Sequence, residues 1–260
     1  MAGKDRKKEL ARQRYERQQQ RRAAEAARAR KLKVFGSAAA VAVIALGGAG
    51  ILLFTGEDEP SGENAAAEAT AAAANGECVY TPSEEPGAPE DLGTPPAKPA
   101  RTGTVNATVK TNQGEVVLQL DGKNAPCTVN SFAFLTEKNY YDDSPCHRLT
   151  SGGLNVLQCG DPTGQGTGGP GYKYADENLD GATYGKGTLA MANSGPGTNG
   201  SQFFMVYEDS QLPPDYTVFG KITTGMDVLE KIAAAGSDPE GDGAPKKKVT
   251  IEDVTVAAAG

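Results

Sequence analysis

Four residues in the second half of the chain combine hydrogen-bonding and aromatic side chains: Arg148, Gln158, Gln202 and Phe204. A turn at 151–153, Ser-Gly-Gly, would fold the segments around Arg148 and Gln158 into an antiparallel hairpin with both side chains on one face. In a strand, Gln202 and Phe204 also share a face, while their neighbours point the other way. The spacing therefore predicts a surface groove that presents a cationic donor, two amides and an aromatic ring.

Other familiar catalytic groups are scarce or badly spaced. The only histidine, His147, should face away from Arg148 and lie in the domain interior with its ring hydrogen-bonded. The glycine-rich stretch 164–171 lacks the Gly-Lys-Ser/Thr of a phosphate-binding loop. The run 176–178, Asp-Glu-Asn, is expected to brace a loop rather than bind a metal. We therefore expect no metal and no cofactor.

The elements that would position the groove lie within 104–257, a length typical of one domain. Its first part reads as a β-hairpin, because apolar and polar residues alternate over 105–109 and an apolar run follows at 116–120. Asn112-Gln113-Gly114 supplies the turn between these two strands. The domain therefore opens with an antiparallel pair.

Two helices and a final strand complete the predicted domain. Apolar residues at helical spacing predict one helix that opens near Pro126, and a second over 226–234 that ends before Gly236. A closing strand is expected over 248–256, with a slip in its alternation at Asp253. Short strands, glycine-rich turns and two helices predict a mainly β fold, namely a closed antiparallel β-barrel capped by two helices.

The amino-terminal part of the chain has an uneven distribution of charge. Residues 1–33 form a basic arm with 13 Lys/Arg and 4 Asp/Glu, whereas 34–260 carry 13 Lys/Arg and 29 Asp/Glu. The span 34–55 contains 22 uncharged residues, enough for a helix to cross the ~30 Å core of a bilayer. A cleaved signal peptide is disfavoured, because the arm and the apolar core are long and no Ala-x-Ala site follows. We predict an uncleaved signal anchor with a cytoplasmic amino terminus and everything after Thr55 outside.

The flanks of this span are predicted to lack a fold of their own. Residues 56–103 are rich in Ala, Pro and Glu and should form a disordered linker, because they cannot bury enough apolar surface to offset the ordering entropy. The small island Cys78-Val79-Tyr80 is the exception, which could dock on the domain or be bridged to it.

The basic arm 1–33 is expected to determine the membrane topology, and the alternative is that it binds nucleic acid. No base-reading fold surrounds the arm, so we expect no nucleic-acid partner.

All four cysteines, Cys78, Cys127, Cys146 and Cys159, follow the predicted span. An even number in an oxidising compartment suggests up to two disulfides, and three connectivities are open. Strand alternation disfavours a bridge between Cys146 and Cys159, because it points them to opposite faces. Without CxxC or Cys/His spacing, zinc binding and thiol-redox catalysis are both disfavoured.

The strongest pattern is a set of four stretches in a fixed order. They are His147-Arg148-Leu149 with 156–161, Gly-rich 164–169 with 176–178, the run 187–204 (GTLAMANSGPGTNGSQFF), and 218–221 (VFGK). The third stretch is the most specific, whereas a glycine-rich loop alone would be weak. In order and spacing the set resembles the cyclophilin family of peptidyl-prolyl cis/trans isomerases, over about 104–257.

The resemblance implies roles for the groove residues. Arg148 would donate a hydrogen bond to the prolyl amide of the substrate, as the main catalytic residue. Gln158 would orient Arg148 and touch the substrate carbonyl, and Phe204 would form the floor of a proline pocket. The other substrate-binding positions that it implies are Val156 and Leu212 in the pocket walls, Asn193 through its main chain, and Ala192 and Gln202 in the adjoining groove.

This sequence departs from the family pattern in three places. Nine residues separate Arg148 from Gln158, two more than the common spacing, so the usual pocket phenylalanine has no clear counterpart and Leu154 is the candidate. The chain contains no tryptophan, and Gln211 stands at the position of the groove tryptophan. Tyr216 stands where the family has a histidine. We therefore expect reduced sensitivity to cyclosporin-type ligands.

These observations predict a membrane-anchored peptidyl-prolyl isomerase whose catalytic domain works outside the cytoplasm. It would accelerate rotation of X-Pro bonds in exported or envelope polypeptides, without a covalent intermediate. The alternative is a proline-segment binding module or chaperone scaffold with little turnover. The expected partners are proline-containing polypeptides and, at 34–55, membrane lipid, and the catalytic domain is expected to be monomeric. The client proteins and the preferred residue before proline stay open.

Overall fold

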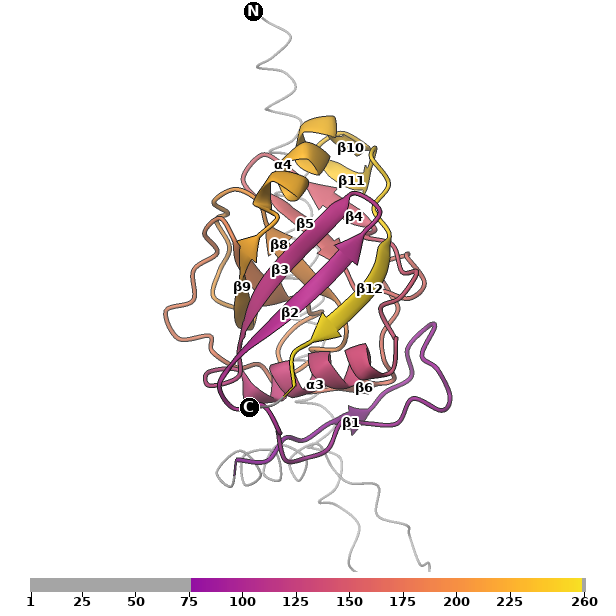
Figure 1. Cartoon of the computed structure of the whole chain (residues 1–260), viewed down its shortest axis with the longest axis vertical. Coiled ribbons are helices and arrows are strands. Elements are labelled where there is room, and N and C mark those ends of the chain that lie inside the picture. Colours follow the sequence, from indigo (N-terminus) through magenta and orange to yellow (C-terminus); the bar gives the residue numbers. More distant parts are fainter. Residues whose placement is uncertain (1–75, 259–260) are drawn as a thin grey trace, which may run out of the picture. The chain divides into compact units, whose positions relative to one another are not determined.

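The computed structural model describes residues 76–258 (Figure 1). The predicted basic arm 1–33, the predicted membrane span 34–55 and the linker portion 56–75 lie outside the described residues. Among residues 76–258, no helix is both long enough and apolar enough to cross a membrane. The predicted signal anchor therefore stays a prediction.

The described chain folds mainly into antiparallel strands. Ten strands form one sheet in the order β10-β11-β4-β5-β8-β7-β9-β3-β2-β12, and β1 and β6 pair separately. The strands are β1 Thr81–Pro82, β2 Thr104–Thr111, β3 Gly114–Asp121, β4 Arg148–Thr150, β5 Val156–Cys159, β6 Tyr172–Lys173, β7 Thr188–Met191, β8 Phe203–Val206, β9 Val218–Thr224, β10 Ser237–Asp238, β11 Asp242–Pro245 and β12 Ile251–Val256.

The prediction of a closed barrel is wrong in one respect, because the ten-stranded sheet keeps two unpaired ends within residues 76–258, β10 and β12. The segments before β4 and before β12 do approach each other, but they share only an isolated bridge between Pro145 and Thr250. Two hydrogen bonds make this bridge, from Cys146 N to the Val249 carbonyl at 3.0 Å and from Ile251 N to the Ser144 carbonyl at 2.8 Å, and the pairing does not extend into a ladder. The mainly β fold itself is confirmed.

Two helices lie at opposite ends of the sheet, as Figure 1 shows. Helix α3 spans Pro126–Glu137 and opens with a proline, which suits a first turn because those N–H groups have no partner inside the helix. Helix α4 spans Met226–Ala235 and ends at Gly236, whose positive φ of 78° favours glycine. Both helices begin where the sequence predicts.

The predicted strand pairing also holds. The hairpin β2–β3 runs in register from Thr104 opposite Asp121 to Thr111 opposite Gly114. Strand β12 pairs with β2 and shifts register between Ile251 and Asp253, at the position of the predicted slip. The break in alternation at Asp253 therefore marks a real irregularity in the sheet.

Strand β8 contributes to two separate apolar clusters. Phe203 and Met205 belong to the main core, which also contains apolar residues of both helices. Phe204 and Val206 belong to a second cluster with residues of β5 and β7. The predicted alternation along β8 is thus confirmed, and the second cluster places an aromatic floor on the outer face of the sheet.

Residues 76–103, here called the strap, lie against this domain. Cys78 forms a disulfide with Cys127 at the start of α3. The Tyr80 hydroxyl donates to the Cys127 carbonyl at 2.8 Å and accepts from Asn130 Nδ2 at 3.0 Å. The strap was predicted as part of a disordered linker, but the disulfide and the Tyr80 contacts hold it in place. Docking of the Cys78-Val79-Tyr80 island is confirmed.

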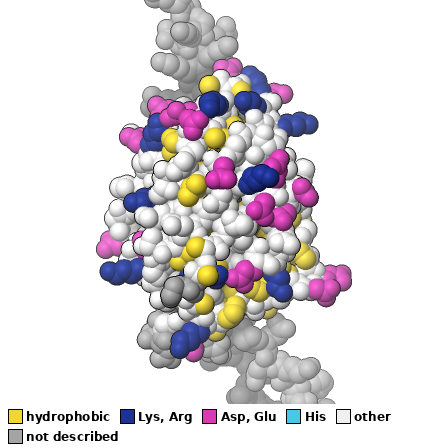
Figure 2. Space-filling model, in the orientation of Figure 1, with side chains coloured by type: hydrophobic (Ala, Val, Ile, Leu, Met, Phe, Trp, Pro, Cys, Tyr) yellow, Lys and Arg dark blue, Asp and Glu magenta, His cyan; other side chains and the backbone are white. Residues whose placement is uncertain are grey.

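The surface carries charges of both signs. Figure 2 shows Lys/Arg and Asp/Glu side chains interspersed over the face in view, without a large area of one sign. A mixed surface offers no extended basic footprint for a polyanion on this face.

Candidate active site

Arg148 and Gln158 lie directly opposite each other on β4 and β5. The pairing register puts both side chains on one face, as predicted, and Arg148 Nη1 donates to Gln158 Oε1 at 3.2 Å. A third residue joins them, because Arg148 Nε and Nη2 donate to the two carboxylate oxygens of Asp242 at 2.7 and 2.8 Å. The guanidinium is therefore held on two sides.

A small cavity of about 130 Å³ lies beside this arginine. Its lining contains one cation, one amide, one aromatic floor and several apolar walls. The residues are Arg148, Leu154, Val156, Gln158, Ala192, Asn193, Phe204, Leu212 and Tyr216. The structure thus brings together every predicted site residue except Gln202, and it places Leu154 at the wall for which it was the candidate. The cavity suits one small apolar group such as a proline ring.

Two tyrosines shape the aromatic side of the cavity. The Tyr216 ring packs on Phe204 at 80° with centroids 5.7 Å apart. The Tyr184 hydroxyl donates to the Tyr216 carbonyl at 2.9 Å and accepts from the Tyr216 N–H at 3.0 Å. Tyr184 thereby fixes Tyr216 on Phe204. The sequence pattern did not single out Tyr184, whose role depends on a contact across 32 residues.

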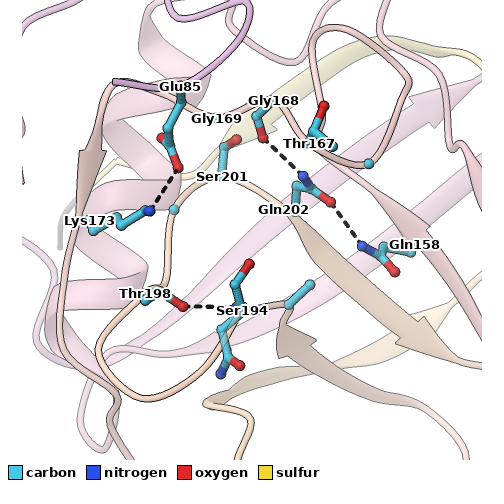
Figure 3. Close-up of a pocket in the computed structure, with 14 residues that line it drawn as sticks. Glu85, Gln158, Thr167, Gly168, Gly169, Lys173, Ser194, Thr198, Ser201 and Gln202 are labelled. Atoms are coloured by element: carbon cyan, nitrogen blue, oxygen red, sulfur yellow. Dashed lines mark hydrogen bonds and ion pairs between the residues drawn. The ribbon is translucent and has the colours of Figure 1, made fainter. Parts of the chain in front are cut away.

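Gln202 lies in a second cavity that adjoins the first, shown in Figure 3. Gln158 Nε2 donates to Gln202 Oε1 at 2.8 Å, and Gln202 Nε2 donates to the Gly168 carbonyl at 2.9 Å. This chain of bonds fixes which end of the Gln158 amide faces Arg148. One N–H of Gln158 stays free for a substrate carbonyl, as its predicted role requires.

Asn193 borders both cavities. Its side-chain Nδ2 donates to the Asp215 carbonyl at 2.8 Å and lies 3.4 Å from Asp176 Oδ1. Because the amide is used within the protein, the main chain of Asn193 is the part available to a ligand. Asp176 also accepts from Gly197 N at 2.7 Å, so it braces this loop as predicted.

The cysteine pairing corrects one sequence-based prediction. Cys146 and Cys159 form a disulfide with their Cα atoms 4.0 Å apart, although alternation disfavoured it. Strand β4 begins only at Arg148, so strict alternation does not extend back to Cys146. Both cysteines belong to the main core, and both lie at the end of the β4–β5 hairpin that is opposite the turn at 151–153. The bridge therefore ties together the two segments that carry Arg148 and Gln158.

His147 was predicted in the interior with a hydrogen-bonded ring; both ring nitrogens are buried, but the prediction of hydrogen bonds to the ring is wrong. The residue is half-buried, and neither ring nitrogen has a hydrogen-bond partner among residues 76–258. Burial lowers the pKa of His147, and the neighbouring Arg148 adds to this against the opposing effect of Asp161.

Lowering the pH should destabilise the fold partly through His147. Its pKa in the folded state lies below the unfolded value of about 6.5, so the unfolded chain takes up the proton first as the pH falls. Stability linked to His147 is thus present above that value and is lost below it. When the pH is lowered from about 7.5 to about 5.5, we expect the melting temperature of His147→Asn to fall less than that of the wild type. Equal losses in the two proteins would contradict this.

Sequence reasoning missed Asp242 and the strap residue Glu85. Glu85 lines the second cavity, where its carboxylate accepts from Gly171 N at 3.2 Å and lies 3.9 Å from Lys173 Nζ (Figure 3). Neither residue stands in a recognisable motif, and no local signal could have linked them to the groove. Gln211, in contrast, is exposed and lines neither cavity. Reduced binding of cyclosporin-type ligands stays a prediction.

The antiparallel sheet with helices at its two ends, the arginine held by a glutamine and the small pocket with a phenylalanine floor agree with what the resemblance to the cyclophilin class of domain implies. Residues 106–256 match the family model described as "Cyclophilin type peptidyl-prolyl cis-trans isomerase/CLD". The chain belongs to the cyclophilin-type peptidyl-prolyl cis-trans isomerase family. The enzyme class that the sequence predicts, an isomerase, is confirmed at the level of the family.

Curated relatives extend the similarity beyond the family domain. A probable peptidyl-prolyl cis-trans isomerase B of Mycobacterium leprae is 50% identical over 197 residues, which cover 67% of this chain and 65% of the relative. A peptidyl-prolyl cis-trans isomerase B of Streptomyces anulatus is 41% identical over 169 residues, 58% of this chain and 95% of the relative. The chain thus spans slightly less than two thirds of the length of the mycobacterial relative.

A solved structure shares the fold. The cyclophilin type peptidyl-prolyl cis-trans isomerase of Cryptosporidium parvum, determined in the presence of the dipeptide Ala-Pro, is 31% identical with a TM-score of 0.53. The similarity covers 59% of this chain and 99% of that structure. The fold shared with this structure therefore includes the part of the chain that carries the candidate site.

Proposed function

We propose that the domain accelerates cis/trans rotation about X-Pro bonds of polypeptides. The observation that carries the proposal is the position of Arg148, fixed by Gln158 and Asp242 at the edge of a pocket floored by Phe204. The barrier to rotation is about 18–20 kcal/mol because the amide is resonance-stabilised. A protein that favours the twisted amide over the planar one lowers this barrier without breaking a bond.

The groove supplies the two functions that such a reaction needs. The apolar walls and the Phe204 floor hold the proline ring, so that the chain on one side of the bond rotates against a fixed group. As the amide twists, the lone pair localises on the prolyl nitrogen, and an Arg148 N–H can donate to it. The free N–H of Gln158 is placed to hold a substrate carbonyl. This is electrostatic stabilisation by preorganised donors, without a covalent intermediate.

A peptide isomerisation assay tests this function. The chain should make cis/trans exchange of an Ala-Pro peptide faster than the uncatalysed reaction, which takes tens to hundreds of seconds. The alternative is a proline-segment binding module or scaffold, which would bind the same peptide without accelerating exchange. Line broadening of the two isomers in NMR spectra separates these outcomes. Binding without exchange broadening would favour the module.

We propose further that a signal anchor at 34–55 holds the domain outside the cytoplasmic membrane, where it acts on exported or envelope polypeptides. The basic arm, the uncharged span and the four paired cysteines support this proposal, because disulfides persist in oxidising compartments. Protease added to intact cells, after removal of any cell wall, should digest the domain. Full protection until the membrane is permeabilised would overturn the orientation.

A further inference from the structure

The guanidinium of Arg148 meets a carboxylate that belongs to another part of the chain. Asp242 lies 94 residues further on, in β11, and accepts from both Nε and Nη2 of Arg148. The two bonds form a planar fork, at 2.7 and 2.8 Å, of the kind that fixes the orientation of an arginine. Arg148 is thereby constrained in a plane rather than merely attracted to a negative charge.

The sheet topology explains how Asp242 reaches this position. Strand β4 lies between β5 and β11, with Asp242 opposite Thr150 and Gly243 opposite Leu149. Asp242 is therefore the diagonal neighbour of Arg148 on the same face of the sheet, within reach of a long side chain. Gly241, just before β11, accepts from Ser151 N at 2.9 Å, which anchors the turn that carries the carboxylate.

The hydrogen bonds also determine which donors remain. Arginine has five N–H groups, and three of them are used here, two by Asp242 and one by Gln158. One N–H on each terminal nitrogen, Nη1 and Nη2, is left for a ligand. Asp242 occupies the Nε–Nη2 edge of the guanidinium of Arg148, a residue that also lines the proline pocket.

Stability alone does not account for this pair. The Arg148 and Asp242 side chains are 38% and 59% exposed, and ion pairs at such a surface contribute little to folding. Hydrogen bonding to Arg148 lowers the pKa of Asp242, so its carboxylate stays charged and keeps the fork closed near neutral pH. The pair orients a side chain that would otherwise sample many rotamers.

We propose that Asp242 is a positioning residue of the isomerase site, which acts on the substrate only through Arg148. The inference rests on the proposed function of the groove. Holding the fork places the two free N–H groups of Arg148 where the prolyl nitrogen develops its lone pair. Without the fork, only the single hydrogen bond to Gln158 holds the guanidinium, and its orientation is less well defined.

Asp242→Asn in the full-length chain tests this role. The amide keeps the size of the side chain but replaces one acceptor by a donor, so the fork with Arg148 cannot form. We expect kcat/KM for an Ala-Pro peptide to fall about ten-fold, because a misplaced catalytic group loses its alignment with the reacting atoms. The loss should fall on kcat, and peptide affinity and melting temperature should stay near wild type. Asp242→Glu should recover part of the rate.

Controls separate positioning from other effects. Asp227→Asn removes a carboxylate from another exposed ion pair, with Lys231 on α4, and should leave the rate unchanged. In an Arg148→Ala background, Asp242→Asn should cause no further loss. The Nε–H signal of Arg148 in NMR spectra should exchange with water faster in Asp242→Asn.

The outcomes divide cleanly between the two proposals. A wild-type chain without isomerase activity overturns the proposed function and, with it, this role of Asp242. A wild-type chain with activity and an Asp242→Asn variant of equal or higher rate overturn the role of Asp242 alone. A loss of rate that also appears in the Arg148→Ala background would do the same, because Asp242 would then act independently of the arginine.

Discussion

Arg148→Ala is expected to lower kcat/KM for X-Pro isomerisation about a hundred-fold to a thousand-fold, the usual loss when one preorganised donor is removed from a polar site. In the proposed reaction this side chain is the cationic donor at the edge of the proline pocket. Alanine removes that donor and leaves Gln158 and Asp242 without their shared partner. The apolar floor and walls remain, so peptide affinity should fall much less than the rate.

Two matched variants make this measurement specific. Arg148→Lys keeps a positive charge but loses the planar fork, so its rate should lie between those of the wild type and the alanine variant. Arg101→Ala removes an arginine that pairs with Glu137 and lines neither cavity of the site, and it should keep the wild-type rate. Rates are compared for protein shown to be folded by its melting curve. A wild-type rate in Arg148→Ala would remove the arginine from the mechanism.

Of the variants proposed for this chain, the one without the Cys78–Cys127 disulfide should lose the most stability. The bridge joins residues 49 apart, and the chain-entropy estimate for a closed loop of this length is about 4 kcal/mol. For a domain of this size, the double variant Cys78→Ala/Cys127→Ala should melt about 8–16 °C lower than the wild type. The bridge is the only covalent link between the strap and α3, and the other strap contacts, such as the β1–β6 pairing and the Tyr80 hydrogen bonds, are individually weak, so the strap should detach first.

Reduction supplies an independent check on the disulfide prediction. Dithiothreitol should lower the melting temperature of the wild type but change that of the double variant less, because one of its two bridges is already absent. Protease cleavage within the strap should become faster in the double variant at temperatures where the sheet is still folded. Equal melting temperatures and equal cleavage would contradict a stabilising role for this bridge.

Local pattern was sufficient for much of the fold. Alternation over 105–120 and the turn at 112–114 predicted the β2–β3 hairpin, and the slip at Asp253 marked a real shift in β12. Helical spacing and the flanking Pro126 and Gly236 marked both helices. Such features depend on neighbours within a few residues, where the two periodicities of backbone structure act directly. Closure of the sheet does not, and there the prediction of a full barrel was wrong.

In the site, too, some features could be predicted from local pattern and others could not. The turn at 151–153 and strand alternation were enough to put Arg148 opposite Gln158, and the resemblance to cyclophilins selected the residues that line the pocket. Alternation misled where the strand ended, because Cys146 lies just before β4 and does not follow its pleat. The cysteine bridge was misjudged for this reason.

The sequence by itself predicted the β2–β3 hairpin, the pairing of the segments around Arg148 and Gln158, both helices and the resemblance to the cyclophilin family. The hairpins and helices follow from periodic burial and short turn motifs, which are local properties of the chain, whereas the pocket residues were implied by the resemblance to cyclophilins. Only the tertiary structure showed that Asp242 accepts hydrogen bonds from Arg148, that Tyr184 hydrogen-bonds to the main chain of Tyr216 and that a disulfide links the strap to the domain. Each of these contacts joins segments far apart in the chain, and their meeting depends on how the whole sheet twists and packs rather than on any local pattern.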